Sequence, residues 1–401
     1  MIDNVDKLWS EKVNSMQKSL IRELLKLTQR EGIISFAGGL PDPNLFPSED
    51  LLKCTETVLK THGSTALQYG LTEGDIGLRK QLADRYNRME GLNVDENNIV
   101  ITTASQQGLD LIGRVFLDKG DVVMCALPSY LGGINAFASY GAEIIGVDLD
   151  DEGMSAKALD AEIAKVKEEG KTPKFIYIVP DFQNPAGITM SKQRRLDILD
   201  VAYKYNLPII EDSPYREVRF DGEPQEMFQS LDNKGFVITL GSLSKVLAPG
   251  FRIGWAMGDP VFLDKIVTVK QVADLCTSSF VQMIAAEYFR QGYYDNNIKL
   301  IINSYREKRD AMLGALEKYM PEGVTWTHPE GGLFLFLILP EHMNSEELFH
   351  KALEKNVAFV IGNVFYCNNA GKNTMRINFS FSSIEENIEG VKRLSEVIKS
   401  L

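Results

Sequence analysis

The sequence predicts an α/β protein with a mostly parallel sheet, and two observations support this fold class. First, short apolar runs rich in β-branched residues alternate with helical patterns along the chain; these runs are 99–102, 122–126, 175–179, 208–210 and 236–240. Second, small or polar residues able to hold a ligand follow each run. Because parallel strands bring their carboxyl ends to one edge of a sheet, we expect a single site at that edge.

The composition indicates a globular protein long enough for two domains, since the chain has 401 residues, of which 44% are hydrophobic and 24% are charged. A net charge of −12 argues against nucleic acid or an anionic membrane as the main partner. Four cysteines and four histidines are too scattered to predict a metal site or a disulfide framework. No stretch is apolar enough for a membrane span and the start does not look like a signal peptide, so we expect a cytoplasmic protein.

Near the N-terminus, residues 21–27 have apolar side chains at helical spacing and predict a short helix, with Arg22 off its apolar face. Paired glycines and prolines in 35–43, Gly39 among them, then predict an irregular backbone that by itself is no more than a connector. Tyr69 precedes a helix expected from about Leu78, and core packing explains a tyrosine there equally well.

The run 99–102 leads into Ala-Ser-Gln-Gln-Gly and then an apolar helical stretch, 109–117. Free backbone N–H groups at a helix start bind anions, which makes Ser105 and Gln106 candidates for a phosphate site. An ordinary helix-capping serine is the alternative. The next run ends in Leu-Pro-Ser-Tyr, where Tyr130 either packs as a half-buried ring or faces a ligand.

Two further runs also end in polar residues. Asn184 follows the run 175–179 in an Asn-Pro-Ala-Gly sequence, which is also a common turn. Asp212 and Tyr215 follow the run 208–210 as Asp-x-x-Tyr, although an aspartate at a strand end is often only a turn or cap residue. An asparagine amide can donate to a phenolate oxygen, and a buried carboxylate can hold a ring nitrogen protonated.

The stretch 242–255, Ser-Leu-Ser-Lys-Val-Leu-Ala-Pro-Gly-Phe-Arg-Ile-Gly-Trp, follows the run 236–240. Its hydroxyls, Ser242 and Ser244, and the guanidinium of Arg252 suit phosphate oxygens, and Lys245 suits a Schiff base with an electrophilic carbon. Pyridoxal 5′-phosphate has both features, whereas a surface loop with one lysine is the simpler alternative.

After Trp255 the pattern becomes mainly helical to about Tyr319, and we expect 303–318 to be a helix that bridges two domains. The segments 331–337, 358–361 and 375–380 then predict strands of a smaller α+β unit. Arg376 lies in the last of these and offers a bidentate fork for a substrate α-carboxylate; a solvated strand arginine is the alternative.

The whole chain resembles the fold-type-I, PLP-dependent class I/II aminotransferases, and within them the 2-aminoadipate and kynurenine aminotransferase branch. The motifs that carry the resemblance are Ser-x-Ser-Lys with an arginine seven residues later, Ser-Gln-Gln-Gly-Leu-Asp, Ala-Gly-Gly-Leu-Pro and Arg-Ile-Asn-Phe-Ser. Ala186 departs from the usual Asn-Pro-Thr-Gly of the family, and Asp75-Ile76-Gly77 stands where many relatives have an aromatic residue and a proline.

The resemblance implies a role for each candidate residue. The catalytic residues are Lys245, Asp212 and Tyr215, and the cofactor contacts include Asn184 on the phenolate oxygen and Tyr130 stacked on the ring. The substrate contacts are Arg376, Asn184, Gly39 and, for a distal carboxylate, Arg22. The phosphate contacts are Ser105, Gln106, Ser242, Ser244, Arg252 and, from the other subunit of a homodimer, Tyr69.

The implied fold is a large domain with a seven-stranded, mostly parallel sheet and a small α+β domain. We expect residues 1–50 to form an arm and part of the small domain, 51–295 the large cofactor-binding domain, and 296–401 the small domain. The implied activity is ping-pong transfer of an amino group from an L-amino acid to a 2-oxo acid, with 2-oxoglutarate expected and no metal. A PLP-dependent β-eliminating lyase and a non-catalytic PLP sensor domain of a transcription regulator are the alternatives.

Overall fold

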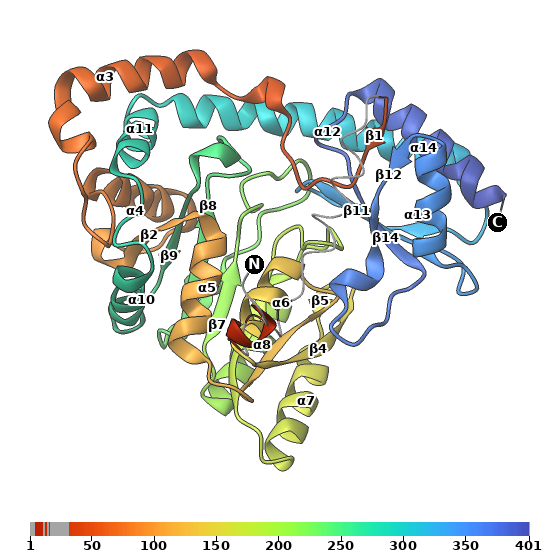
Figure 1. The fold of residues 1–401 in the computed structure, drawn as a ribbon, viewed down its shortest axis with the longest axis horizontal. Helices are drawn as coiled ribbons and strands as arrows, with labels where there is room; N and C mark the ends of the chain where they lie inside the picture. The colour runs from red at the N-terminus through yellow and green to blue at the C-terminus, as the bar shows by residue number, and fades with distance from the viewer. Residues whose placement is uncertain (1–4, 11–12, 14–15, 17–31, 401) are drawn as a thin grey trace.

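The computed structural model describes residues 5–10, 13, 16 and 32–400, and it arranges them around a large sheet and a smaller one (Figure 1). The large sheet has eight strands. In spatial order they are β2 (Ile99–Thr103), β9 (Ile253–Met257), β8 (Val237–Ser242), β7 (Ile209–Asp212), β6 (Pro173–Ile178), β3 (Val122–Leu127), β4 (Glu143–Asp150) and β5 (Gly153–Met154).

The strands β8, β7, β6, β3 and β4 pair in parallel, and β9 runs antiparallel to both β8 and β2. The predicted mostly parallel sheet is therefore confirmed, with one strand more than the seven expected. The extra strand, β5, has two residues and pairs antiparallel with β4, because the chain reverses directly after Asp150 through Gly153 at φ +97°. Two residues are too few to give a periodic signal in a sequence.

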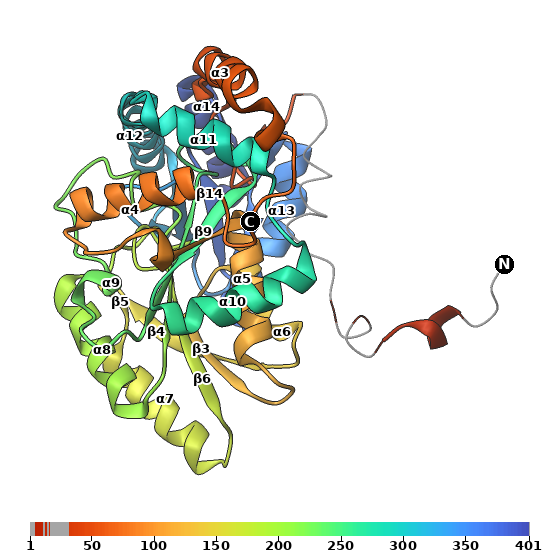
Figure 2. The same ribbon diagram turned by 90° about the vertical axis from the view of Figure 1, so that its left-hand side faces the viewer.

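Helices cover both faces of the large sheet, as Figure 2 shows with α8 and α9 on one side and α5, α6 and α10 on the other. Successive residues of β3 divide between two cores: Met124 packs with α7 and α8, and Cys125 packs with α5 and α6. This double burial explains the continuous apolar runs of the sequence. These helices are α5 (Ala104–Phe116), α6 (Leu131–Ala138), α7 (Ala156–Glu168), α8 (Lys192–Tyr205), α9 (Phe228–Leu231) and α10 (Pro260–Ala273).

The smaller sheet is antiparallel. Its order is β10 (Thr325–Trp326), β11 (Phe334–Ile338), β14 (Thr374–Asn378) and β13 (Val360–Ile361), and α13 (Ser345–Glu354) and α14 (Ile384–Lys399) lie beside it. Strand β1 (Ile34–Ser35) pairs in parallel with β12 (Val357–Ala358). The first described strand of the chain therefore joins the C-terminal unit.

The predicted bridging helix is confirmed as α12 (Tyr293–Tyr319), which is longer than the expected 303–318. It runs from the large sheet to the smaller one (Figure 1). Near its start, the Tyr294 hydroxyl donates to Glu217 at 3.0 Å, and farther along Lys308 Nζ donates to the carbonyl of Ser380 at 2.9 Å. The same helix is therefore bonded to both units.

Helices α3 (Ser48–Ala66), α4 (Ile76–Glu90) and α11 (Ser279–Arg290) lie at the β2 end of the molecule (Figure 1). The short 3₁₀ helices are η1 (Val5–Leu8), η2 (Pro43–Leu45), η3 (Glu96–Asn98), η4 (Pro249–Phe251) and η5 (Gly362–Phe365). The helix expected at 21–27 falls outside the described residues. Within the part of the chain that is described, no helix has the length and apolar character needed to cross a bilayer.

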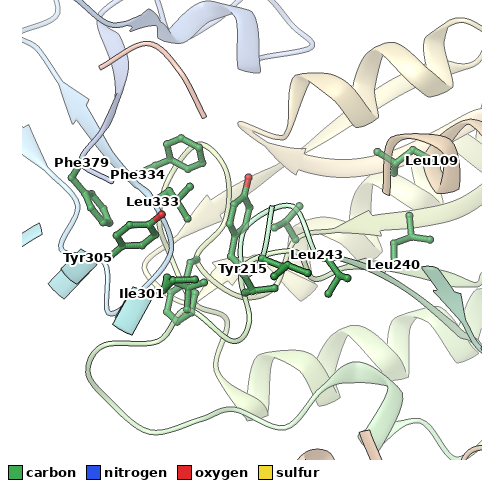
Figure 3. Close-up of a cluster of buried hydrophobic side chains, with 14 of the residues drawn as sticks. Leu109, Tyr215, Leu240, Leu243, Ile301, Tyr305, Leu333, Phe334 and Phe379 are labelled. Carbon is green, nitrogen blue, oxygen red and sulfur yellow. The ribbon is translucent and has the colours of Figure 1, made fainter. Parts of the chain in front are cut away.

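One hydrophobic core connects the two sheets. Figure 3 shows Tyr215 lying between Phe334 of β11 on one side and Leu243, just beyond β8, on the other. The rings of Tyr215 and Phe334 meet edge to face, with centroids 5.8 Å apart. This packing fixes the small sheet against the carboxyl edge of the large one, where the candidate site lies.

Candidate active site

Four candidate residues meet at the carboxyl edge of the large sheet because their strands are neighbours. Lys245 follows β8, Asp212 ends β7, Asn184 follows β6 and Tyr130 follows β3, and the sheet order is β8, β7, β6, β3. The prediction that these residues share one edge is confirmed. Residues more than a hundred positions apart therefore converge on one site.

Lys245 is a half-buried amine held against the N-terminal loop, where its Nζ donates to the carbonyl of Gly39 at 2.7 Å. Desolvation lowers the pKa of Lys245 to about 8, and the positive charges of Arg376 and Arg252 act in the same direction. An ordinary lysine is almost fully protonated near pH 8. This one is about half neutral there and can act as a nucleophile or a base.

Asp212 is a buried carboxylate with one bonded and one unbonded oxygen. Its side chain is 2% exposed, and Oδ2 accepts a hydrogen bond from the Tyr177 hydroxyl at 2.8 Å. Among the described residues nothing donates to Oδ1. Burial raises the pKa of Asp212 to about 7, and the Tyr177 hydrogen bond opposes that rise. A buried oxygen without a donor is costly, so this position suits a ligand that brings a positively charged N–H.

Arg376 and Asn184 form a connected pair beside the lysine. Arg376 Nη1 donates to Asn184 Oδ1 at 2.9 Å, and Nη2 donates to the carbonyl of Ala37 at 3.0 Å. Asn184 Nδ2 in turn donates to the Tyr215 hydroxyl at 3.2 Å. Arginine, asparagine and tyrosine thus lie in a single chain of hydrogen bonds that crosses from the small sheet to the large one.

The guanidinium of Arg376 is 3% exposed, so the alternative of a solvated strand arginine is wrong. It lies over the rings of Phe334 and Phe365, 4.1 Å and 5.1 Å from their centroids. Burial lowers the pKa of Arg376 to about 10. Its hydrogen-bond partners are the neutral Asn184 and the carbonyl of Ala37, and its Nε has no acceptor among the described residues. A buried cation of this kind suits a ligand carboxylate.

An anion cradle lies at the start of α5. Ala104 begins this helix at φ +59°, and its N–H donates to the carbonyl of Arg252 at 2.9 Å. A Cβ on Gly254 would lie 2.5 Å from the Ala104 carbonyl carbon and 2.6 Å from Ser105 N. Glycine at 254 therefore lets β9 pass close to the helix start, and the close approach brings the Arg252 backbone beside Ala104.

The two serines of the lysine loop adjoin each other. Ser244 N donates to Ser242 Oγ at 3.1 Å, and the two hydroxyl oxygens are 2.9 Å apart. Gln106 is exposed, and its amide donates to the carbonyl of Gly132 at 3.2 Å. Hydroxyls, backbone N–H groups and a guanidinium are the donors that phosphate oxygens require.

The other aromatic and basic candidates are less buried or lie outside the described residues. Tyr130 is half-buried between β3 and α6, near enough to Tyr215 and Arg376 to affect their pKa values. Tyr69 is 80% exposed on the loop after α3. Arg22 lies outside the described residues. No cluster of three or more His, Cys, Asp or Glu in the described ranges is arranged to hold a metal ion.

Sequence reasoning missed three contributors. Tyr177 is the hydrogen-bond donor to Asp212, and a tyrosine inside an otherwise apolar buried strand was the available signal. Phe334 and Phe365, which flank Arg376, gave none, because they are ordinary apolar residues until the chain folds.

A single cofactor would satisfy the amine, the unpaired carboxylate oxygen and the anion cradle together. Pyridoxal phosphate has an aldehyde, a ring nitrogen that can be protonated and a phosphate group. The sheet order and the residues at this edge therefore fit a PLP-dependent enzyme, the class that the sequence motifs predict.

Comparison with known proteins shows which family of enzymes this chain belongs to. The family model "Aminotransferase class I and II" matches residues 38–394. The chain is 46% identical to aromatic-amino-acid aminotransferase 1 of Thermococcus litoralis over 98% of this chain and 94% of that protein. The crystal structure of Pyrococcus horikoshii kynurenine aminotransferase, a complex with PMP, superposes with a TM-score of 0.96 at 45% identity, covering 99% of this chain and 98% of that one. The structure of the α-aminoadipate aminotransferase LysN of Thermus thermophilus, complexed with N-(5′-phosphopyridoxyl)-L-leucine, superposes with a TM-score of 0.91 at 38% identity. The match covers 99% of this chain and 98% of that one.

The chain therefore belongs to the class I and II aminotransferase family, and it is a PLP-dependent aminotransferase. The resemblance noted from the sequence motifs is confirmed, as are the fold type and the cofactor.

Proposed function

We propose that this aminotransferase moves the amino group of an L-amino acid to 2-oxoglutarate in two half-reactions, with Lys245 as the covalent anchor and proton carrier. The observation that carries the proposal is the position of the Lys245 amine, which follows β8, beside Asp212 at the end of the neighbouring strand β7. The pKa of this amine is lowered to about 8. The Arg376–Asn184 pair supports it, since this pair supplies a buried cation for the α-carboxylate that donor and acceptor share.

The roles of the side chains follow from their chemistry. When bound, PLP supplies a carbonyl carbon that joins to an amine and a ring that accepts electrons from the substrate Cα. The Lys245 amine, once free, would take the proton from the substrate Cα and deliver it to the former aldehyde carbon of PLP, on the other side of the amino nitrogen. Asp212 Oδ1, which has no donor among the described residues, would hold the proton on the ring nitrogen by charge pairing. Arg376 orients the α-carboxylate, so that the Cα–H bond faces the lysine.

The other contacts position the cofactor and the substrate. Asn184 and Tyr215, which are hydrogen-bonded to each other, would donate to the phenolate oxygen, and Tyr130 would stack on the ring. The Gly39 loop would close over the substrate once Lys245 Nζ leaves its carbonyl. The proposed phosphate contacts are Ser105, Gln106, Ser242, Ser244 and Arg252.

We also propose a cytoplasmic homodimer in which Tyr69 reaches the phosphate of the other subunit. Support comes from the exposure of Tyr69 on a loop that also exposes Leu67 by 71% and Leu71 by 63%, an apolar surface that a second copy would cover. The pairing of β1 with β12 supports the assignment of 1–50 to the small domain, with 51–295 as the large domain and 296–401 as the rest of the small one. Sedimentation of the purified protein tests the dimer, and a monomer at micromolar concentration would contradict it.

The test of the reaction is the absorption spectrum of the PLP-loaded protein during each half-reaction. Adding L-glutamate should remove the cofactor band, and excess 2-oxoglutarate should restore it. Lys245→Ala should bind cofactor without either change, whereas Lys265→Ala, at an exposed lysine of α10, should behave as wild type. Pyruvate and ammonia in place of an oxo acid and a new amino acid would overturn the proposal in favour of β-elimination.

Two variants refine the substrate assignment. Arg376→Lys should raise KM for the amino donor by about tenfold to a hundredfold, because a lysine cannot make both hydrogen bonds to a carboxylate. Arg22→Ala should lower activity on glutamate more than on neutral amino acids. Equal losses on both would refute a role for Arg22 in binding a distal carboxylate.

A further inference from the structure

Two cysteines far apart in the sequence meet where the two sheets adjoin. Cys125 lies in β3, and its register partner in β4 is Gly146. The sulfur of Cys367, in the loop after η5, lies 3.0 Å from where a Cβ on Gly146 would be. The thiols of Cys125 and Cys367 lie near enough to shift each other's pKa, and both are free. Glycine at 146 therefore opens the space in which the second sulfur sits beside the first.

The two thiols differ in access and in acidity. Cys125 is 1% exposed, whereas Cys367 is half-buried and is followed by three exposed residues, 368–370. The interaction with Cys367, together with burial, raises the pKa of Cys125. The interaction with Cys125, aided by backbone N–H groups and opposed by burial, lowers the pKa of Cys367. Cys367 is thus the thiol that ionises first and meets molecules from the solvent.

We propose that Cys125 and Cys367 are a redox-sensitive pair, which hydrogen peroxide converts into a disulfide that joins the large sheet to the small-sheet unit. The Cys367 thiolate attacks one oxygen of peroxide; the O–O bond breaks, and the products are a sulfenic acid and hydroxide, which takes up a proton to become water. The sulfur of Cys125 then attacks the sulfur of Cys367, and the hydroxyl leaves with the thiol proton as a second water. Two thiols and one peroxide thus give one disulfide and two waters; the sulfurs lose two electrons and the peroxide oxygens gain them.

The cross-link would act on the active site through two short connections. Tyr130 follows Cys125 by five residues, and Phe365, two residues before Cys367, packs against Arg376. The N–H of Ser129 also donates to the carbonyl of Phe365 at 2.9 Å, which couples the two segments. An S–S bond of about 2.05 Å is shorter than any non-bonded contact between two thiols, so at least one segment must shift when it forms.

A displacement of about 1 Å at a substrate-orienting group can slow an enzyme by about a hundredfold. We therefore expect oxidation to lower kcat by about tenfold or more, and a reducing agent to reverse the loss. This proposal concerns the thiols and stands whether or not the amino donor and acceptor are those proposed above.

The experiment treats the purified PLP-loaded protein with stoichiometric hydrogen peroxide and then maps its peptides without reduction. The expected result is a peptide pair linked through Cys125 and Cys367, with two of the four thiols lost. Transaminase activity should fall in parallel and return with dithiothreitol. Cys276→Ser, which removes another half-buried thiol, should behave as wild type, and Cys367→Ser should keep its activity under peroxide.

Other outcomes overturn the proposal. Oxidation of Cys367 without a link to Cys125 would refute the proposed disulfide. A linked peptide with unchanged activity would refute the proposed effect of the disulfide on catalysis. Loss of activity in Cys367→Ser equal to that of wild type also refutes the coupling. Because Cys125 is in the core, Cys125→Ala is made beside Cys125→Ser; both must fail to form the link if they fold. The linked peptide and the thermal unfolding midpoint are measured on wild type, so failure of the transamination assay is distinguishable from failure of this proposal.

Discussion

The hydroxyl of Tyr177 provides a test of the charge on Asp212, because it donates to Oδ2 at 2.8 Å inside the core. Tyr177→Phe removes this donor and keeps the ring that packs against Phe137 at a centroid distance of 5.3 Å. The carboxylate then loses the hydrogen bond that opposes the effect of burial, so the pKa of Asp212 should rise above its present value of about 7.

The size of the effect follows from the energy of that hydrogen bond. A hydrogen bond to a charged group contributes about 1.5–3 kcal/mol, and 1.36 kcal/mol corresponds to one pH unit, so the pKa of Asp212 should rise by about 1 to 2. At pH 7 the ionised fraction of Asp212 then falls about tenfold. Because the ionised carboxylate is the form that pairs with a protonated ring nitrogen, PLP should bind the variant about tenfold more weakly at pH 7 and equally well at pH 10.

The assay is the Kd of PLP for the apoprotein, measured by fluorescence quenching from pH 6 to pH 10 and expressed as the ratio of variant to wild type. Tyr288→Phe is the matched control, because the Tyr288 hydroxyl is also buried but has no partner among the described residues. A ratio that stays constant with pH, or an equal loss in Tyr288→Phe, would refute the reasoning and assign the effect to packing.

Three further predictions follow from the same site. Because the pKa of Lys245 is lowered to about 8, the rate at which the apoprotein takes up PLP should rise about tenfold from pH 7 to pH 9 and then level off. The rate is measured by rapid-mixing absorbance, and a rate that still rises beyond about pH 10 would indicate a lysine with an ordinary pKa. The raised pKa of Asp212 means that the folded apoprotein binds more protons than the unfolded chain between about pH 4 and pH 7, so its stability falls as pH rises through that window. Asp212→Asn should therefore stabilise the apoprotein by about 2–3 kcal/mol more at pH 8 than at pH 5 in urea denaturation, while weakening PLP binding; an equal effect at both pH values would contradict this. Gly254→Ala places a Cβ against the backbone at the start of α5, so it should lower the free energy of unfolding by about 1–3 kcal/mol and weaken PLP binding. Gly250→Ala, whose added Cβ would have nothing within 4 Å, should do neither. A stable Gly254→Ala variant with normal PLP affinity would show that the start of α5 tolerates the methyl group.

The local sequence was sufficient to name the strands of the large sheet that carry candidate residues at their carboxyl ends. Each apolar run became a strand of the large sheet within a few residues of its expected bounds, because burial on both faces of a parallel sheet demands such runs. Lys245, Asp212 and Asn184 were named as candidates because they follow such strands, and open α/β sheets bind ligands at the carboxyl ends of their strands. Their meeting at one edge could also be predicted, since it follows from parallel pairing alone.

Tertiary structure alone decided how these groups are charged and paired. The sequence does not show that Tyr177 bonds Asp212, that one oxygen of Asp212 is left without a donor, or that two phenylalanines enclose Arg376, because those contacts depend on which strands become neighbours. The short strand β5 and the meeting of Cys125 with Cys367 were hidden for the same reason. The pattern of apolar residues along a chain indicates which residues are buried and where strands end. The pKa values of Lys245 and Asp212 depend instead on desolvation, nearby charges and hydrogen bonds, which come from atoms in distant parts of the chain.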